Sequence, residues 1–542
     1  MGLDSSRCIG VVAALAAAVA LAPGSSPAAT HHVLRRPVLV EARLESPGGG
    51  RARVALRWSE PVRIGHPGRV RFLGASGPGR RGRLLSRRPG RVETFLVAGS
   101  VTEVHVLAGA GHGRGGPTRP AILPITTVPS PVFRPGGPTP PVVAPGGHAL
   151  PPLSSAFLDS VGVNIHAGYL DTSYGNAGAL ERAVIGLGVH HVRDSACVSC
   201  TQERSVLLAL AQAGIKTDFG TGGPGDSESL ASQVDLLDGP MNPAVASIEG
   251  PNEYDSSGDS NWVAAVRSYQ QELYRRVRAA PHLAGVPVLG PSLANPDDAS
   301  ALGDLSSWLD QGNLHPYPGD QVPDANLASQ RHAETAVAGA RGVAVTETGY
   351  TTGLAGDGGE LPVSETAASA YIPRAVLDDF RAGITRTYVY ELLDEKSDPA
   401  GLDPQQHFGL LHIDYSPKPA YQTLQALLGA VAPAQGAPVV RSLLDYQILE
   451  GPSDLRELLF QTATHGYALV LWRNVSVWDR TGHHDQTPSA ETVVLRLGRG
   501  VSPTGLRRLD APGPDAPPQP DQTGAVQVSV AGMPLVLDLH RP

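Results

Sequence analysis

The chain has 542 residues, enough for about three or four domains of ordinary size. Apolar residues make up 41% of it and charged residues 17%, which excludes a chain that is disordered throughout. The net charge of -8 is small for this length, so the composition does not suggest a nucleic-acid-binding protein.

Residues 1–29 have the pattern of an export signal. Arg7 precedes an apolar run from Cys8 to Ala22, and small residues continue to Ala29. The run is shorter than a usual membrane span, so we expect cleavage and a secreted, cell-surface or periplasmic protein. An uncleaved anchor is the alternative. Because no later stretch is long and apolar enough to cross a bilayer, we expect no membrane span in the mature protein.

The region 30–114 is predicted to be a small β-sandwich-like domain. Short stretches at 38–40, 54–58, 70–73, 94–97 and 104–107 alternate apolar with polar residues, and Gly and Pro separate them. Six nearby arginines give this domain a basic character: Arg80, Arg81, Arg83, Arg87, Arg88 and Arg91. A solvated basic face is the simpler interpretation, and contact with an acidic cell-surface polymer is the alternative. Residues 115–153 are rich in Pro and Gly, which predicts a semi-rigid linker.

The region 154–431 alternates short apolar runs with amphipathic segments. Strands are predicted at 161–165, 190–193, 216–219, 245–249, 286–289, 312–315, 343–346 and 385–390. Helices are predicted at 177–187, 202–213, 227–237, 261–279, 298–311, 328–340, 364–382 and 419–428. Eight strand–helix units in a domain of this size are typical of a (β/α)8 barrel, an α/β fold. A doubly wound sheet would need a phosphate-binding glycine turn after its first strand, and none follows here.

Residues 432–542 are predicted to form a C-terminal β-sandwich beside the barrel. Its strands are expected at 439–444, 455–462, 467–473, 491–497, 526–531 and 535–539. A loop rich in Pro, Asp and Gly interrupts them at about 511–523. Asn474-Val475-Ser476 is a glycosylation acceptor sequence that would matter only in a host that glycosylates.

Cys197 and Cys200 are the cysteines outside the export signal. In an exported protein, a Cys-Val-Ser-Cys pair most simply forms a local disulfide. A zinc site would need further ligands, for which His190 and His191 are the near candidates. We expect the disulfide and no metal.

Polar side chains gather where the predicted barrel strands end. The ends of all strands of such a barrel meet at one mouth, where reactive groups lie. These residues are Asn164, His166, Arg193, Asp194, Asp218, Asn252, Glu253, His315, Tyr317, Glu347, Tyr390, Glu391 and Asp394. A barrel built for stability alone would not need so many.

Two of these residues, Glu253 and Glu347, suit glycoside hydrolysis. They end the fourth and seventh strands, which lie nearly opposite each other in an eight-stranded ring. Hydrolysis of a glycosidic bond needs one carboxyl that protonates the leaving oxygen and another that attacks the sugar or activates water. We therefore expect a carbohydrate substrate between them. Glu249, by contrast, is expected to face the barrel wall or core.

Two motifs resemble the signatures of glycoside hydrolase clan A, a group of retaining (β/α)8 enzymes. They are Gly250-Pro251-Asn252-Glu253 and Thr346-Glu347-Thr348-Gly349-Tyr350, and families 39 and 5 look nearest. By this resemblance, Glu253 is the acid/base and Glu347 the nucleophile of a secreted retaining hydrolase acting on O-glycosidic bonds, with β-linkages expected. The same resemblance implies that Arg193 of Val192-Arg193 and Tyr317 of His315-Pro316-Tyr317 lie beside the nucleophile.

One stretch departs from the clan pattern. Many members place a Trp at the end of the eighth strand as a sugar platform, whereas this chain has Tyr390-Glu391-Leu392-Leu393. The identity of the sugar is therefore left open.

The expected site has a simple electrostatic arrangement. The charge of Arg193 and the hydroxyl of Tyr317 would lower the pKa of Glu347 and keep it ionised. Asn252 suits a hydrogen bond to the sugar 2-hydroxyl. The other expected substrate contacts are His315, Asn164, His166, Asp218, Tyr390 and Glu391.

Two other functions stay open at this stage. A carbohydrate-binding or adhesion protein could keep the barrel without turnover, although a binder has no need of both glutamates. A transglycosylase would use the same residues with a sugar as acceptor. No metal or organic cofactor is expected, because two carboxyls and water suffice.

Overall fold

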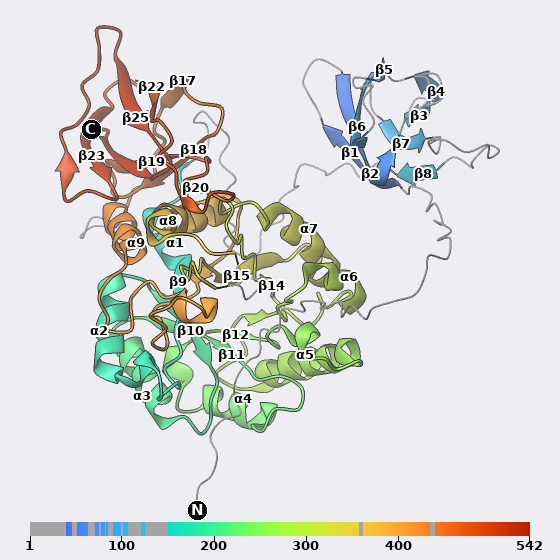
Figure 1. Ribbon diagram of the computed structural model, residues 1–542, viewed down its shortest axis with the longest axis vertical. Coiled ribbons are helices and arrows are strands. Elements are labelled where there is room, and N and C mark those ends of the chain that lie inside the picture. The colour runs from blue at the N-terminus through green and yellow to red at the C-terminus, as the bar shows by residue number, and fades with distance from the viewer. Residues whose placement is uncertain are drawn as a thin grey trace, which may run out of the picture. The chain divides into compact units, whose positions relative to one another are not determined.

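The computed structural model (Figure 1) describes residues 150–356, 361–433 and 439–542, and the backbone of eight strands among residues 1–149. The predicted export signal and the arginine side chains of the N-terminal domain lie outside the described residues. The chain divides into two compact units, Ala18–Gly137 and a larger one that contains Pro138–Pro542. Of the described helices, none is both long and apolar enough to cross a lipid bilayer.

The N-terminal unit contains two antiparallel sheets. One has the order β1-β2-β6-β5, and the other the order β4-β3-β7-β8. Their bounds are β1 (Leu39–Glu45), β2 (Arg51–Val62), β3 (Arg71–Gly74), β4 (Gly77–Arg81), β5 (Arg83–Leu84), β6 (Gly90–Ala98), β7 (Val101–Val106) and β8 (Ala121–Pro124). Strand β8 lies inside the stretch interpreted as a linker and pairs with β7. The sheet domain therefore extends to about residue 124.

Within the described residues, eight parallel strands close into a barrel in which β16 pairs back with β9. The strands are β9 (Val161–Asn164), β10 (His191–Ser195), β11 (Lys216–Gly220), β12 (Val245–Glu249), β13 (Val288–Leu289), β14 (Gln311–Leu314), β15 (Gly342–Thr348) and β16 (Thr387–Val389). The predicted (β/α)8 fold is confirmed. Buried Val, Ile and Leu side chains of the strands pack against the surrounding helices, which gives the barrel its core.

The helices surround the barrel strands (Figure 1). They are α1 (Ser154–Asp159), α2 (Ala177–Leu187), α3 (Thr201–Gln212), α4 (Leu230–Asp238), α5 (Trp262–Ala279), α6 (Ala299–Leu302), α7 (Leu327–Ala338), α8 (Glu365–Arg381) and α9 (Pro419–Ala430). Short 3-10 turns connect some of them: η2 (Ser173–Gly175), η3 (Asn242–Ala244), η4 (Tyr254–Ser256), η5 (Pro296–Asp298) and η6 (Pro404–His407).

The helix predicted at 298–311 is wrong in length. Helix α6 ends at Leu302 because Gly303 follows with a φ of 70°, a left-handed conformation that ends a helix. Leu305 and Leu309 are nevertheless fully buried. Their spacing from Leu302 resembles a helical face, but the side chains belong to a packed loop that leads into β14.

The C-terminal region forms two antiparallel sheets and a small hairpin. One sheet is β17 (Tyr446–Glu450), β22 (Glu491–Leu497) and β25 (Ala525–Val530). The other is β18 (Leu455–Gln461), β19 (Gly466–Arg473), β26 (Leu535–His540), β23 (Ser502–Arg508) and β24 (Pro514–Asp515). The hairpin is β20 (Trp478–Asp479) and β21 (His484–Asp485). Both sheets enclose a separate apolar core, as in a β-sandwich.

The strand predicted at 439–444 is wrong. That segment forms no strand, and β17 begins at Tyr446 instead. The reason is that the Gln461 side chain forms hydrogen bonds with the backbone of this segment. It accepts from Ser442 N–H and donates to Val440 O. Backbone groups that would pair with a neighbouring strand in a sheet are thus paired with a side chain instead.

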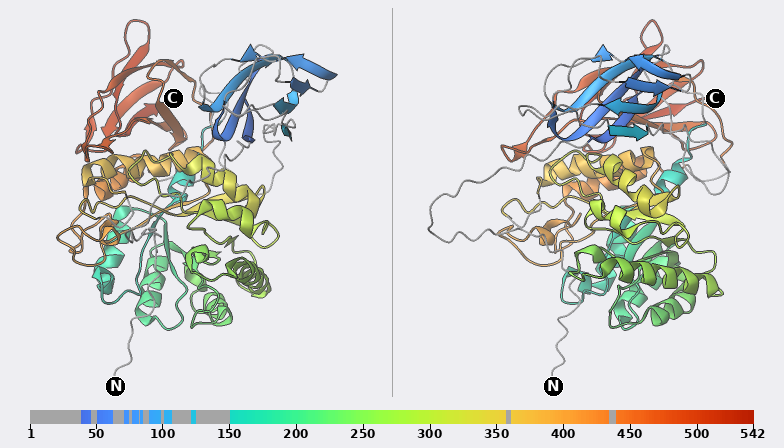
Figure 2. Two further views of the ribbon diagram at one scale, coloured as in Figure 1. Left: turned by 45° about the vertical axis from the view of Figure 1, so that its right-hand side comes forward. Right: turned by 90° about the vertical axis from the view of Figure 1, so that its right-hand side faces the viewer.

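The sandwich packs on the helical layer of the barrel that contains α8 and α9 (Figure 2). At the contact, the Phe460 ring of β18 lies 4.9 Å from that of Phe157 in α1 and 5.6 Å from that of Phe380 in α8. Buried residues of the sandwich, such as Trp472, belong to the same apolar cluster as the barrel core. Barrel and sandwich therefore share a continuous core.

Candidate active site

The ends of the barrel strands surround a cavity of about 650 Å3. It is lined by nine of the expected site residues: Asn164, His166, Arg193, Asn252, Glu253, His315, Tyr317, Glu347 and Tyr390. The barrel brings together groups that are up to 226 residues apart in sequence, the separation of Asn164 from Tyr390. This is the end of a (β/α)8 barrel at which active sites lie.

Glu347 is held by two neighbours at the end of β15. Arg193 donates from Nη1 to its Oε1 at 2.6 Å, and the Tyr317 hydroxyl donates to its Oε2 at 2.8 Å. Burial alone would raise the pKa of Glu347, but the charges of His315 and Arg193 and these hydrogen bonds lower it to about 2. Glu347 is therefore a carboxylate at neutral pH.

Arg193 is itself fixed from several sides. It pairs with Glu249 through Nε–Oε1 at 2.5 Å and Nη2–Oε2 at 3.2 Å. It also donates to Asn164 Oδ1 at 3.0 Å and to Asn252 Oδ1 at 2.8 Å. Four strands thus meet at one guanidinium group. Its closest partner is Glu249, and both side chains of this ion pair are buried.

Glu253 lies across the cavity from Glu347. It follows β12 with a φ of 46°, a left-handed conformation that costs energy for a residue with a side chain. Its Oε1 lies 2.8 Å from His315 Nδ1. One carboxylate oxygen of Glu253, one of Glu347 and a ring nitrogen of His315 all lie within 4.8 Å of one another. The two carboxyl groups are therefore close enough to act on one glycosidic bond.

A buried hydrogen-bond chain orients His315. Its Nε2 lies 3.0 Å from Thr346 Oγ1, and that hydroxyl donates to Asn313 Oδ1 at 2.7 Å. Since the Thr346 proton is used in this way, Thr346 Oγ1 accepts from His315 Nε2–H. Nδ1 therefore shares a proton with Glu253. Burial lowers the pKa of His315, but the charge of Glu347 and the hydrogen bond with Glu253 raise it overall.

Aromatic rings line the side of the cavity formed by the eighth and first strands. The Tyr390 ring lies 5.7 Å from that of His166, 6.3 Å from that of Tyr317 and 5.5 Å from that of Phe408. Tyr169 stacks on His166 at 4.7 Å. The peptide bond from Tyr390 to Glu391 is cis. These rings form one wall of the cavity near the end of β16.

Glu391 lies behind that wall, fully buried. Tyr174 donates its hydroxyl proton to Glu391 Oε2 at 2.8 Å, and His166 Nε2 lies 3.4 Å from the same oxygen. Burial and the charge of Glu395 raise the pKa of Glu391 well above its ordinary range. Burial lowers the pKa of His166 to about 4, so its imidazole is neutral at neutral pH. Glu391 does not line the cavity, so the structure corrects the expectation that it contacts the substrate.

The structure corrects the expectation that Asp218 contacts the substrate. Its side chain is fully buried and does not line the cavity. In the register of the barrel it lies beside Arg193 on one side and Ser247 on the other, within the strands rather than at their ends. Burial and the neighbouring Glu249 carboxylate raise the pKa of Asp218 well above its ordinary range.

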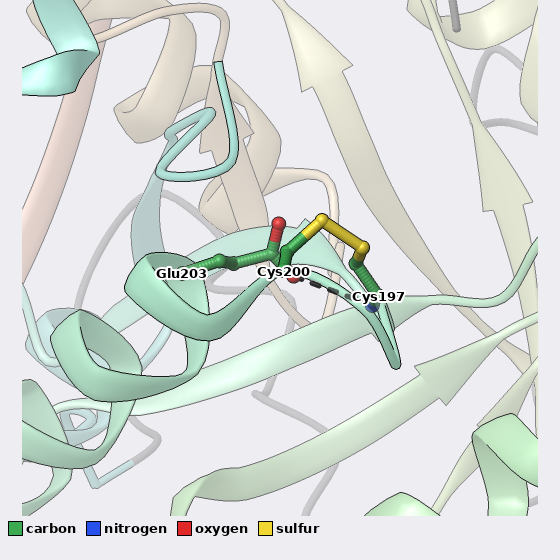
Figure 3. A group of neighbouring side chains, drawn as sticks. All are labelled: Cys197, Cys200 and Glu203. Atoms are coloured by element: carbon green, nitrogen blue, oxygen red, sulfur yellow. Dashed lines mark hydrogen bonds between the residues drawn. A yellow bond between two sulfur atoms is a disulfide. The ribbon is translucent and has the colours of Figure 1, made fainter. Parts of the chain in front are cut away.

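Cys197 and Cys200 form a disulfide in the loop that follows β10 (Figure 3). Glu203 of α3 lies beside them and accepts from the Cys197 N–H at 3.3 Å. Both sulfurs are engaged in the bond, so this group does not offer thiolate ligands to a metal. Among the described residues, the other groups close enough to hold an ion are Glu253, His315, Glu347 and His166, Glu391, Glu395.

Solved structures share this architecture. A family 39 glycoside hydrolase from Bacteroides cellulosilyticus WH2 matches 92% of this chain and 96% of its own at 13% identity, with a TM-score of 0.50. This chain therefore has the fold of that solved glycoside hydrolase. A monomeric β-xylosidase from Caulobacter crescentus CB15 matches over 72% of this chain and 97% of its own at 15% identity, with a TM-score of 0.48. No protein-family model matches the sequence, and no curated protein does either.

The barrel also contains residues whose positioning roles the motifs did not reveal. Thr346 and Asn313 orient His315, and Glu249 fixes Arg193. For Asn313 a signal was present, because it stands two residues before His315 and alternate residues of a strand face the same side. For Thr346 and Glu249 no comparable signal separates a buried structural residue from one that holds a catalytic group.

Proposed function

We propose that the protein is a secreted retaining glycoside hydrolase that cleaves β-linked O-glycosidic bonds by double displacement. The observation that carries this proposal is the pair of carboxylate oxygens, one from Glu253 and one from Glu347, within 4.8 Å of each other. Retaining enzymes have carboxyl groups about 5–5.5 Å apart, whereas inverting enzymes need about 6.5–9.5 Å for an intervening water. Secretion rests on the pattern of residues 1–29.

In the first step, Glu347 is the nucleophile. Its carboxylate attacks the anomeric carbon, and a bond from that carbon to a Glu347 oxygen forms as the glycosidic C–O bond breaks. Glu253 gives its proton to the leaving oxygen, so the departing group is a neutral alcohol. The low pKa of Glu347 keeps the nucleophile ionised, and the proton shared between Glu253 and His315 supplies the acid.

In the second step, water enters where the alcohol left. Glu253, now a carboxylate, takes a proton from that water, and the oxygen attacks the anomeric carbon. The bond to Glu347 breaks, Glu347 becomes a carboxylate again, and Glu253 recovers its proton. Two inversions at one carbon leave the configuration retained. A sugar hydroxyl in place of water would give transglycosylation with the same residues.

Asn252 is suited to the sugar 2-hydroxyl. Its Oδ1 is already engaged, accepting from Arg193 at 2.8 Å and from the Ser292 hydroxyl at 3.3 Å. The amide NH2 group is then the part of Asn252 that can donate to a substrate hydroxyl. Such a bond strengthens as positive charge develops on the sugar ring in the transition state. On the other side, Tyr390 and the neutral His166 offer a ring face and a polar edge to the sugar.

The test is turnover by the purified protein and two variants. A panel of 4-nitrophenyl β-glycosides and β-linked oligosaccharides is incubated with wild type, Glu253→Ala and Glu347→Ala. Both variants are expected to lose at least about a thousandfold in kcat on a substrate that the wild type cleaves. Glu450→Ala, which removes an exposed glutamate of β17, is the matched control. NMR of the first-formed sugar is expected to show retained configuration.

Three other outcomes would change the proposal. Variants that match wild-type turnover would remove the assignment of both glutamates. A protein that binds a glycan but cleaves none of the panel would be a carbohydrate-binding or adhesion protein. Longer oligosaccharides in place of free sugar would identify a transglycosylase.

A further inference from the structure

The loop between β14 and α7, residues 315–326, carries part of the catalytic machinery. It contains His315 and Tyr317, the partners of Glu253 and Glu347, and five of its residues beyond His315 line the cavity: Tyr317, Pro318, Gly319, Gln321 and Asn326. Asn326 Nδ2 donates to the Tyr317 carbonyl at 2.8 Å. The position of the Tyr317 backbone therefore depends on the far end of the loop. We call this segment the Tyr317 loop.

Two aspartates of the Tyr317 loop, Asp320 and Asp324, form hydrogen bonds with side chains of the C-terminal sandwich. Arg480, which follows β20, donates from Nε to Asp320 Oδ1 at 2.6 Å. The Asp320 side chain is 6% exposed. Asn474 donates from Nδ2 to Asp324 Oδ1 at 3.0 Å, and Arg456 of β18 pairs with Asp324 Oδ2 at 3.3 Å. Hydrogen bonds of this kind, in which one or both partners are charged, are stronger than neutral ones.

Asn474 also connects the loop to helix α8. Its Oδ1 accepts from Arg374 Nη2 at 3.0 Å, and the same arginine, fully buried in α8, donates to Val475 O at 2.8 Å. The side-chain amide of Asn474, a residue of the sandwich, thus links the Tyr317 loop to helix α8. The nitrogen of Asn474 that would carry a glycan is the one that donates to Asp324, so the folded protein uses this acceptor sequence for structure.

A second route from the sandwich reaches the same loop. The Tyr371 hydroxyl of α8 accepts from Val477 N–H and lies 3.0 Å from Ser476 Oγ. The Tyr371 ring stacks on that of Tyr350 at 5.1 Å, and the Tyr350 hydroxyl donates to Gln321 O at 2.9 Å. The Tyr317 loop is therefore held on both sides by groups that the sandwich fixes.

We propose that the C-terminal sandwich belongs to the catalytic unit, and that Arg480 and Asn474 are positioning residues that hold Tyr317 against Glu347. Loops that carry functional residues are the mobile parts of a fold unless other elements fix them. A displacement of about 1 Å at a reacting group can cost about a hundredfold in rate. The inference rests on the proposed hydrolase activity, since turnover is its readout.

The first test compares Arg480→Ala and Asn474→Ala with wild type on a 4-nitrophenyl β-glycoside that the wild type cleaves. We expect kcat to fall about tenfold with little change in KM. The reason is that a displaced loop disturbs the geometry of the reacting groups more than it weakens binding of the substrate in its ground state. Arg480→Lys, which keeps a cation near Asp320, should recover part of the loss. Arg508→Ala removes an exposed pair with Asp515 inside the sandwich and is the matched control.

The pH profile gives a readout that a purely structural role would not move. The charged and titratable groups around Glu347 are Arg193, Glu253, His315, Tyr317, His166, Tyr390 and Glu391. In Arg480→Ala, a looser Tyr317 should raise the pKa of Glu347, so activity should fall at a higher pH on acidification than in wild type. Arg508→Ala should retain the wild-type profile.

The decisive measurement is a double-mutant cycle with Tyr317→Phe. If Arg480 acts through Tyr317, adding Arg480→Ala to Tyr317→Phe should cost much less than the tenfold seen in wild type. Equal losses in both backgrounds, or wild-type kcat in both positioning variants, would overturn the inference. If the wild type itself cleaves nothing, the proposed hydrolase activity fails instead. Should Arg480→Ala not fold, Asn474→Ala carries the same cycle.

Discussion

Arg193 shows how much of the site depends on one side chain. It holds Glu347 ionised. It donates to Glu347 and Asn164 from Nη1, and to Glu249 and Asn252 from its other two nitrogens. Since two buried carboxylates face one guanidinium group, losing Arg193 would leave both without their counter-charge, which costs several kcal/mol. Its loss would therefore affect folding and catalysis together. Tyr317 is the cleaner probe of Glu347, because the Tyr317 hydroxyl can be removed without disturbing a buried charge pair.

Tyr317→Phe is predicted to reduce kcat/KM about tenfold at neutral pH and to move the acidic side of the profile upward. The hydroxyl helps to lower the pKa of Glu347 to about 2, so its removal lets that pKa rise by about one unit. Glu347 is then protonated, and inactive as a nucleophile, at a higher pH. The measurement is kcat/KM against pH for wild type and variant. A variant whose acidic limb coincides with that of the wild type would remove Tyr317 from this role.

At the scale of elements, the ends of the strands position the site. A surrounding helix can also contain a buried ionisable group that affects stability. Glu334 of α7 faces β14 and is 3% exposed. It accepts at 3.2 Å from the N–H of Asn313, the residue that orients His315 through Thr346. Burial raises the pKa of Glu334 to about 8. A carboxyl group there supports β14 but requires a bound proton.

Glu334→Gln is predicted to stabilise the protein at pH 8 and to weaken the pH dependence of its stability. The unfolded chain releases this proton near pH 4.5, whereas the folded chain keeps it until about pH 8. The contribution of Glu334 to the free energy of unfolding is therefore largest below pH 4.5. It falls by about 1.4 kcal/mol per pH unit as the pH rises to about 8. Gln keeps the acceptor for Asn313 and has no proton to lose. Thermal unfolding from pH 5 to 8 measures the effect.

Glu450→Gln, at an exposed position, is the control for this experiment. It removes the same formal charge without a burial cost, so the slope of stability with pH should match that of the wild type. If Glu334→Gln shows the same slope as Glu450→Gln, burial of Glu334 does not govern the pH dependence.

At the scale of the whole molecule, one apolar cluster extends from the barrel into the sandwich, beside the separate core between the two sheets. Phe460 lies between Phe157 and Phe380, and its ring is fully buried. Continuous apolar packing of this kind couples the unfolding of the parts it joins. The hydrogen bonds from the sandwich to the Tyr317 loop add a functional connection to the structural one.

Phe460→Ala is predicted to destabilise the barrel and the sandwich together by about 3–5 kcal/mol, because it leaves a cavity in their common core. Denaturant unfolding of residues 150–542 should show one transition at a lower midpoint by circular dichroism and by tryptophan fluorescence. Leu449→Ala, 40% exposed on β17, should change the midpoint little. A sandwich that unfolds first, while the barrel keeps its wild-type midpoint, would show that the two are independent.

Local patterns in the sequence are enough to predict the barrel and the places of the two glutamates at its strand ends. Hydrophobic runs and amphipathic helices are local patterns, and a carboxylate such as Glu347 at the end of a buried strand is visible without knowledge of its neighbours. The same local patterns misled at 298–311, where Leu305 and Leu309 pack from a loop, and at 439–444, where Gln461 replaces a neighbouring strand.

The tertiary structure alone decided which groups meet. Asp218 pairs with Arg193 and Ser247 in the closed barrel, but its side chain is fully buried and does not line the cavity. The chain from Asn313 through Thr346 to His315 crosses from β14 to β15 and back. Such contacts depend on strand register and barrel closure, which relate residues far apart in sequence. For that reason the two glutamates can be picked out from the sequence, whereas the groups that surround them, including those of the sandwich, require the fold.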